Sequence, residues 1–404
     1  MNDEQPNTSN EHSTDPWESE MSREFDKRVR DIHEAPLTFE NVKGKAMTIR
    51  RNRRIAVAGG ILAAAAVVVP VAVFAGNGLG ESNDNLDPVA PTVTQATDPN
   101  DPTPTETPTG ALGVSYLEGT TWHRTDGSSV ELNHEYTAGA ELDDSLLAVR
   151  QDDRARLTID VVDTDGAVVA SLDTYSYPMA SPDGTAAAYI ARNGQLQIYT
   201  STGDSLSMAD GFVDGDSIAA VTGDDCATGG VNCVVYITHG DGTDAEAIAS
   251  EGNRSVIEPN VYKLNDVSPD ARTAAQTSSS DSGSCSAVID RGGPQVFETC
   301  EYTFDNFSSD AAHLSGTDAY RDGFGQGYVV ILDATNGNQV ARWNATEGLA
   351  TNWIWEDESH LLIQAYEQGE WRIYRLGVDG KSEQVLSSTE GDDMTPAFTL
   401  LGGH

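Results

Sequence analysis

Two hydrophobic patterns divide the chain of 404 residues. The first is an uncharged run of 22 residues, 55–76, with the sequence IAVAGGILAAAAVVVPVAVFAG. This length suits a membrane-spanning helix, because a helix rises about 1.5 Å per residue and the bilayer core is about 30 Å thick. The second pattern occupies residues 111–404, where short apolar stretches alternate with turns rich in Asp, Gly, Asn and Ser. The two patterns predict one membrane span followed by an all-β domain.

The charges beside the span predict its orientation. The next basic residue after the span is Arg124, whereas basic residues crowd the stretch before it: Lys43, Lys45, Arg50, Arg51, Arg53 and Arg54. Because cytoplasmic flanks carry the excess of Lys and Arg, we expect residues 1–54 in the cytoplasm and the C-terminal part outside the plasma membrane. The alternative is a signal peptide cleaved before Gly76, although its 54 preceding residues are many for one.

Weaker patterns describe the segments on either side of the span. Before Pro36, apolar residues recur at helical spacing: Trp17, Met21, Phe25, Val29 and Ile32. They predict a short amphipathic helix in the cytoplasmic stub, which either rests on the inner leaflet or docks a cytoplasmic partner. After the span, residues 77–110 are rich in Pro, Thr, Asp and Asn, which predicts an extended, solvated stalk.

The β domain contains a loose repeat. It is clearest after Ser181-Pro182-Asp183-Gly184, where the strands AAAYIAR and LQIYTS flank an Asn-Gly turn. Six such units recur at intervals of about 36 to 50 residues, a spacing typical of four-stranded propeller blades. The ends of the domain supply a seventh unit, because TPAFTLL takes the place of a first strand while GVSYL, TTWHR and SSVEL take those of the next three. We predict a seven-bladed β-propeller closed by strands from both termini, which leaves no free sheet edge.

Two segments resemble known proteins. Residues 37–54, with a Val-Lys-Gly-Lys-Ala core and an Ile before the Arg-rich run, resemble the juxtamembrane segment of actinobacterial single-pass membrane proteins. The Ser-Pro-Asp-Gly turn resembles those of TolB-like and WD-repeat-like propellers. The resemblance implies a membrane protein with an exported propeller. Some of these proteins are anti-sigma-like regulators, but residues 1–54 contain no cysteine for the zinc site of the best-known anti-sigma domains.

The charge after the span limits the choice of partner. This part holds 53 acidic and 14 basic residues, a formal charge of −39. Such a field repels nucleic acid and anionic lipids and favours cations or a basic partner, while a merely solvated acidic surface is the alternative.

The cysteines all follow the span and fall in two close pairs, Cys226 with Cys233 and Cys285 with Cys300. Outside the cytoplasm this spacing predicts two local disulfides. We expect the first across the turn between the second and third strands of the third unit. We expect the second at the facing ends of the third and fourth strands of the next unit.

Chemical motifs are few. The sequence has no G-x-S-x-G, H-E-x-x-H or Walker A motif, so no catalytic residue and no cofactor is predicted. Asp163-x-Asp165-Gly166 and Asp241-Gly242 could hold Ca²⁺, although Asp-Gly is also a common hairpin turn. Trp353, Trp355 and Trp371 are core residues in one interpretation and a ligand platform at the channel mouth in the other.

The leading functional hypothesis is a membrane-anchored extracytoplasmic propeller that binds a protein, peptide or glycan in the cell envelope, without enzymatic activity. One alternative is an exported hydrolase or lyase with carboxylates around the channel. Another is a transmembrane regulator that signals through residues 16–54. A channel mouth with converging carboxylates and a histidine would favour the enzyme, and an aromatic or featureless mouth would favour binding.

Overall fold

The computed structural model describes residues 112–402, except 231, 243, 259–260, 281–282 and 321–323. The predicted stub, span and stalk, with the six basic residues before the span, lie outside these residues and stay predictions. In the described part of the chain, no helix is long and apolar enough to cross a membrane.

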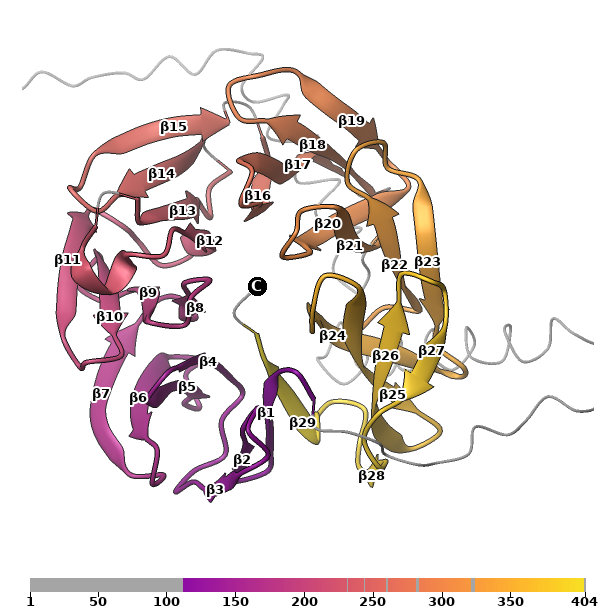
Figure 1. The fold of residues 1–404 in the computed structure, drawn as a ribbon, viewed down its shortest axis with the longest axis horizontal. Helices are drawn as coiled ribbons and strands as arrows, with labels where there is room; N and C mark the ends of the chain where they lie inside the picture. The colour runs from indigo at the N-terminus through magenta and orange to yellow at the C-terminus, as the bar shows by residue number, and fades with distance from the viewer. Residues whose placement is uncertain are drawn as a thin grey trace, which may run out of the picture. The chain divides into compact units, whose positions relative to one another are not determined.

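The described residues form seven antiparallel sheets that surround a central axis (Figure 1). We call the sheets blades 1 to 7 and the four strands of each blade A to D, from the axis outward. Strands A to D of blade 1 are β4 (Ala138–Leu142), β5 (Ser145–Gln151), β6 (Leu157–Asp163) and β7 (Val168–Thr174). Those of blade 2 are β8 (Met179–Ala180), β9 (Ala186–Ile190), β10 (Gln195–Thr200) and β11 (Ser205–Asp210).

The next three blades follow the same order. Strands A to D of blade 3 are β12 (Ser217–Thr222), β13 (Val234–Thr238), β14 (Ala245–Ala249) and β15 (Arg254–Glu258). Those of blade 4 are β16 (Lys263–Val267), β17 (Arg272–Ser280), β18 (Gly283–Asp290) and β19 (Gln295–Thr299). Those of blade 5 are β20 (Tyr302–Phe307), β21 (His313–Asp318), β22 (Tyr328–Asp333) and β23 (Gln339–Asn344).

The last two blades bring the chain back to its beginning. Strands A to D of blade 6 are β24 (Gly348–Trp355), β25 (His360–Glu367), β26 (Glu370–Gly377) and β27 (Ser382–Gln384), and β28 (Thr389–Glu390) also pairs with β26. Those of blade 7 are β29 (Phe398–Leu401), β1 (Ser115–Glu118), β2 (Thr121–His123) and β3 (Ser129–Glu131). The C-terminal strand β29 pairs antiparallel with β1, from Ser115 with Leu401 to Glu118 with Phe398. The predicted seven-bladed propeller and its closure by both termini are therefore confirmed.

The inner strands are apolar on both faces because each blade packs between two others. In β5, Leu146 and Ala148 belong to a core cluster shared with blade 7, whereas Leu147 and Val149 belong to a cluster shared with blade 2. All seven core clusters consist of residues between Leu112 and Leu401, so the propeller contains its own core.

Strand direction defines two faces of the propeller. Successive strands are antiparallel, so the A–B and C–D connections lie on one face, which we call the turn face. The B–C and D–A connections lie on the other, which we call the loop face. Because β29 ends and β1 begins beside each other, the described chain starts at Leu112 and ends at Gly402 on the turn face.

Candidate ligand site at the mouth of the central channel

Three A–B turns of the turn face share one hydrogen-bonding arrangement. In each, a buried serine hydroxyl donates to the aspartate two residues later: Ser181 to Asp183, Ser268 to Asp270 and Ser308 to Asp310, over 2.5 to 2.7 Å. The same hydroxyl accepts the backbone N–H of a residue that leads into strand B, as Ser181 does from Ala186. These Ser-x-Asp turns are therefore fixed by their own side chains.

The aspartates of these turns are held as anions. Partial burial raises the pKa of Asp183, but hydrogen bonds from Ser181 and Thr185 outweigh it and leave the pKa below its usual value. The pKa values of Asp270 and Asp310 are lowered in the same way, with Arg272 contributing to the first. Each carboxylate is occupied within its own turn, so these three residues are fixed parts of the mouth rather than groups available for proton transfer.

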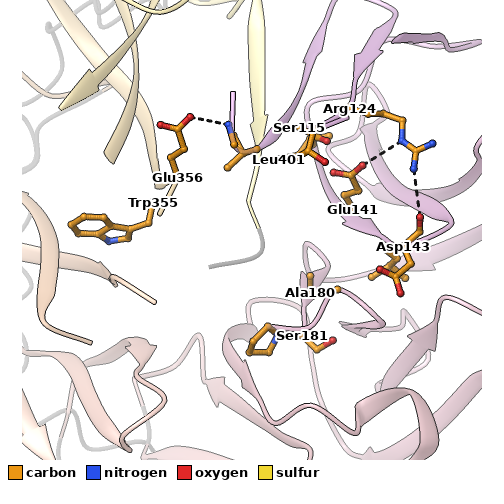
Figure 2. A pocket seen from close by; sticks show the side chains of 15 residues that line it. Ser115, Arg124, Glu141, Asp143, Ala180, Ser181, Trp355, Glu356 and Leu401 are labelled. Carbon is orange, nitrogen blue, oxygen red and sulfur yellow. Dashed lines mark hydrogen bonds and ion pairs between the residues drawn. The ribbon is translucent and has the colours of Figure 1, made fainter. Parts of the chain in front are cut away.

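A polar cavity of about 390 Å³ opens between blades 6, 7, 1 and 2 (Figure 2). It collects charged side chains from three blades: Arg124 after β2, Glu141 on β4 and Glu356 after β24. Asp143 and the Ser181 turn complete its rim. We call this space the polar cavity.

Glu141 is a partly buried carboxylate whose side chain is 22% exposed. Burial raises its pKa, and the raised value persists although Ser115 and Arg124 act in the opposite direction. The Arg124 Nε atom lies 3.7 Å from Glu141 Oε1, and the Arg124 guanidinium lies 5.0 Å from the centroid of the Trp122 ring. Glu141 therefore has one loose cationic partner and an open side toward the cavity.

Glu356, in the same cavity, joins two parts of the ring. Its carboxylate accepts the backbone N–H of Gly113 over 2.8 Å and both the Nε and the Nη2 hydrogens of Arg375. The side chain is 6% exposed, so the guanidinium compensates the charge in a dry setting. Glu356 thus ties the beginning of β1 to blade 6, across the junction where the ring closes.

An apolar cavity of about 420 Å³ adjoins the polar one and shares Pro182 with it. Its apolar lining comes from the A–B ends of blades 2 to 5: Pro182, Val221, Val267, Pro269 and Phe307. Asp266 also lines it, but this carboxylate accepts the backbone N–H groups of Val267 and Phe307, both over 2.7 Å. The mouth therefore has a charged half and an apolar half.

The three tryptophans do not form one platform. Trp355 and Trp371 are buried in different core clusters, and Trp353 packs beside the first of these. The Trp355 indole donates to the Asn306 carbonyl and the Trp371 indole to that of Asp392, both over 2.9 Å. They bind neighbouring parts of the ring together, and only Trp355 also lines the polar cavity.

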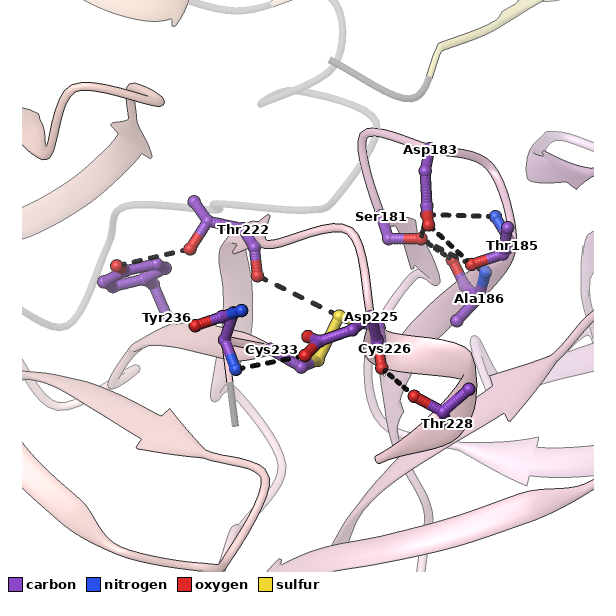
Figure 3. The surroundings of a disulfide bond; sticks show 11 residues. Ser181, Asp183, Thr185, Ala186, Thr222, Asp225, Cys226, Thr228, Cys233 and Tyr236 are labelled. Carbon is purple, nitrogen blue, oxygen red and sulfur yellow. Dashed lines mark hydrogen bonds between the residues drawn. A yellow bond between two sulfur atoms is a disulfide. The ribbon is translucent and has the colours of Figure 1, made fainter. Parts of the chain in front are cut away.

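The disulfides join the predicted pairs, Cys226 with Cys233 and Cys285 with Cys300. Figure 3 shows the surroundings of the first. The second lies at the facing ends of β18 and β19, strands C and D of blade 4, as predicted. The first lies between β12 and β13, which are strands A and B, so the prediction of strands two and three was wrong for this pair. Blade 3 has a longer loop with a 3₁₀ turn at Cys226–Thr228 in place of a Ser-x-Asp turn, and its first strand was therefore counted as the second.

The Asp-Gly turns serve as hairpin turns. Asp163 Oδ1 accepts the backbone N–H groups of Asp165 and Ala167 over 3.0 and 2.9 Å, and the Gly242 N–H donates to the His239 carbonyl. No group of three His, Cys, Asp or Glu side chains suited to a metal ion occurs among the described residues.

Sequence reasoning did not find Arg124, Glu141 or Glu356. Each of them is a charged residue near a strand end, with no motif around it. They come together only when the ring closes, as the contact between Gly113 and Glu356, 243 positions apart in the sequence, shows. The Ser-x-Asp turns were the available signal, because they mark three of the A–B connections that surround the mouth.

Comparison with known proteins shows similarity at the level of solved structures only. No protein-family model matches the chain, and no curated protein matches it in sequence. A complex of KlAtg21 with the coiled coil of AgAtg16 gives a TM-score of 0.46 at 16% identity, over 68% of this chain and 94% of that one. The Myceliophteria thermophila Cps50 (Swd1) β-propeller domain gives a TM-score of 0.44 at 10% identity, over 64% of this chain and 87% of that one. The computationally designed Ika8 protein gives a TM-score of 0.46 at 13% identity, over 70% of this chain and 88% of that one.

Proposed function

We propose that this chain is a membrane-anchored extracytoplasmic binding module that captures an exported protein or peptide through a basic group. The observation that carries the proposal is the channel mouth, where a polar cavity with Glu141 and Asp143 adjoins an apolar cavity. A ligand with a cationic group beside an apolar one matches both halves. The anchor rests on the sequence, since residues 55–76 are long and apolar enough to span a bilayer.

The charge balance of the mouth supports a cationic ligand. Glu356 is compensated by Arg375, and Arg124 is the only cationic residue among the described ones that line the cavity. Arg124 lies beside the Glu141 carboxylate and donates to the backbone carbonyl of Asp143, so the Asp143 carboxylate is not its partner. One negative charge is thus left without a cationic partner within the polar cavity. A Lys or Arg side chain of a partner would neutralise it and would be drawn in by the acidic field of the exported part.

The fragment from Ala96 to His404 includes all seven blades, and we call it the Ala96–His404 unit. Retention of envelope proteins on this immobilised unit tests the proposal. We expect a basic protein to be retained at low salt and released at high salt, because exposed charges are screened beyond about 8 Å at physiological ionic strength. The double variant Glu141→Gln/Asp143→Asn should lose it. The control Asp165→Asn/Asp204→Asn removes the same charge from exposed C–D turns and should retain it. Equal retention by both variants would exclude the mouth as the binding site.

A hydrolase is the second candidate, and the raised pKa of Glu141 is the observation that favours it. A carboxyl with a raised pKa in a cavity is suited to donate a proton. A second catalytic carboxylate would also be needed, and Glu356 is already bound by Arg375 and Gly113. Turnover of a glycan or ester library that disappears in Glu141→Gln, with no retained partner, would replace the binding proposal by this one.

A further inference from the structure

The exposed apolar side chains are distributed unequally between the two faces. Among the described residues, the large apolar side chains that are 36% to 60% exposed are of two kinds. One kind lies on the outer strands: Val169, Leu206, Val256 and Val340. The other kind lies in connections of the loop face: Tyr177, Val213, Tyr262, Tyr320, Phe324 and Met394. No described A–B or C–D connection of the turn face carries one.

The sequence of the loop-face connections is acidic overall. The B–C connections of this face contain six acidic and four basic residues: Asp152, Asp153, Asp241, Asp244, Asp281 and Asp322, with Arg154, Arg156, Arg192 and Arg321. Seven D–A connections join each blade to the next, and none of them contains a Lys or Arg. Four of these connections carry Tyr177, Val213, Tyr262 and Met394. The acidic residues of the seven are Glu135, Asp214, Glu301, Glu347, Asp392 and Asp393, together with Asp216, which is buried against His239. Apolar tips beside carboxylates favour a surface that presents both apolar groups and positive charge.

A hollow of the same face adds polar contacts. A cavity of about 560 Å³ lies between blades 4 and 5, lined by Tyr320, Lys263, Asn265, Gln276 and further small polar residues. The Asn265 side chain donates to the Phe304 carbonyl over 2.8 Å and so joins the A strands of the two blades. The hollow is therefore a built part of the ring, next to one of the exposed aromatic side chains.

We propose that the loop face is a second docking surface, which binds a basic amphipathic segment of another protein. A second copy of this chain would bring the same acidic residues to the contact and is repelled. The chain's own stalk, residues 77–110, holds acidic residues and no Lys or Arg, so it is repelled too. The proposal is independent of the channel mouth, which opens on the opposite face.

The surface can be tested with synthetic peptides of defined chemistry. The probes are an 18-residue amphipathic Leu/Lys helix, the same sequence with Ser in place of Leu, and the same sequence with Glu in place of Lys. Titration into the Ala96–His404 unit should show that the Leu/Lys peptide binds at least tenfold more tightly than either of the others. Equal binding of the Ser/Lys peptide would mean that charge alone acts, and equal binding of the Leu/Glu peptide that charge plays no part; either result overturns the proposal.

Matched variants locate the contact. Tyr177→Ser/Tyr262→Ser/Met394→Ser removes three exposed side chains from the loop face and should weaken Leu/Lys binding at least tenfold. Val169→Ser/Val256→Ser/Val340→Ser removes three side chains that are 39% to 60% exposed from the outer strands and should change it less than twofold. All six side chains are more than a third exposed, so both variants are expected to fold. Equal weakening by the two variants, or none by the first, would overturn the proposal.

Discussion

Closure of the ring by β29 can be tested with one substitution, Phe398→Ala. Phe398 is 2% exposed and packs in a core cluster with Leu112, Leu362 and Trp371. Its partner across the sheet is Glu118 of β1. The cluster thus contains side chains from both ends of the described chain, and Phe398 supplies the largest one that β29 contributes.

The expected loss follows from the burial. Replacing a fully buried Phe by Ala removes its apolar contacts and leaves a cavity, at a cost of about 3 to 5 kcal/mol. A domain is commonly stable by about 5 to 15 kcal/mol, so one residue should account for a large part of the free energy of unfolding. The substitution Thr399→Ala on the same strand, where the side chain is only partly buried, should cost less than about 1 kcal/mol.

Urea unfolding followed by tryptophan fluorescence measures both effects. Trp371 lies in the same cluster as Phe398 and reports on it directly, and its indole donates to the Asp392 carbonyl just before β29. We expect a much lower unfolding midpoint for Phe398→Ala and a midpoint near that of the native chain for Thr399→Ala. Equal midpoints for the two variants would refute the argument that β29 closes the ring energetically.

Three further predictions concern the disulfides, the loss of stability at acidic pH and the membrane topology. Replacing both cysteines of one pair by serine should lower the free energy of unfolding by about 2 to 3 kcal/mol, because the disulfides close loops of 7 and 15 residues. The loss is measured as a shift of the urea midpoint, and the reduced native protein should match the variant that lacks both pairs. Because the pKa of Asp183 is lower in the folded chain than the usual value of about 3.9, its stabilisation is present above that value and is lost as the pH falls toward the lowered pKa. The Asp183→Asn variant should therefore be less stable than the native chain at neutral pH and should lose less stability on acidification. A fall of stability with decreasing pH identical to that of the native chain would contradict the role of this turn. Protease added to intact, wall-stripped cells should release a soluble fragment that begins within residues 77–110, whereas release without protease, with a new N-terminus at Gly76, would support a signal peptide instead.

The blades could be predicted because their information is local. Short apolar strands, Asp-Gly and Ser-Pro-Asp turns and the cysteine spacing each depend on neighbours in sequence, and the unmatched strands at both ends of the domain indicated the seventh blade. Blade 3 was misjudged at Cys226 and Cys233 because a disulfide loop takes the place of the Ser-x-Asp turn that marks the A–B connections of blades 2, 4 and 5.

The mouth could not be predicted because its information is not local. Arg124, Glu141 and Glu356 come from three blades and meet only when the ring closes. Trp355 and Trp371 were ambiguous for a related reason, since their burial depends on residues outside their own strands: Asn306 of blade 5 and Asp392 in the connection to blade 7.

Photocrosslinking in living cells tests partner capture most directly. A benzophenone amino acid at Thr125, an exposed position on the rim of the polar cavity, should crosslink an exported protein at low salt, and the adduct should disappear in the Glu141→Gln/Asp143→Asn background. The same group at Val169, on the outer strand of blade 1, should give no adduct. An adduct from Val169 equal to that from Thr125, or none from Thr125, would contradict the account that the channel mouth captures a partner.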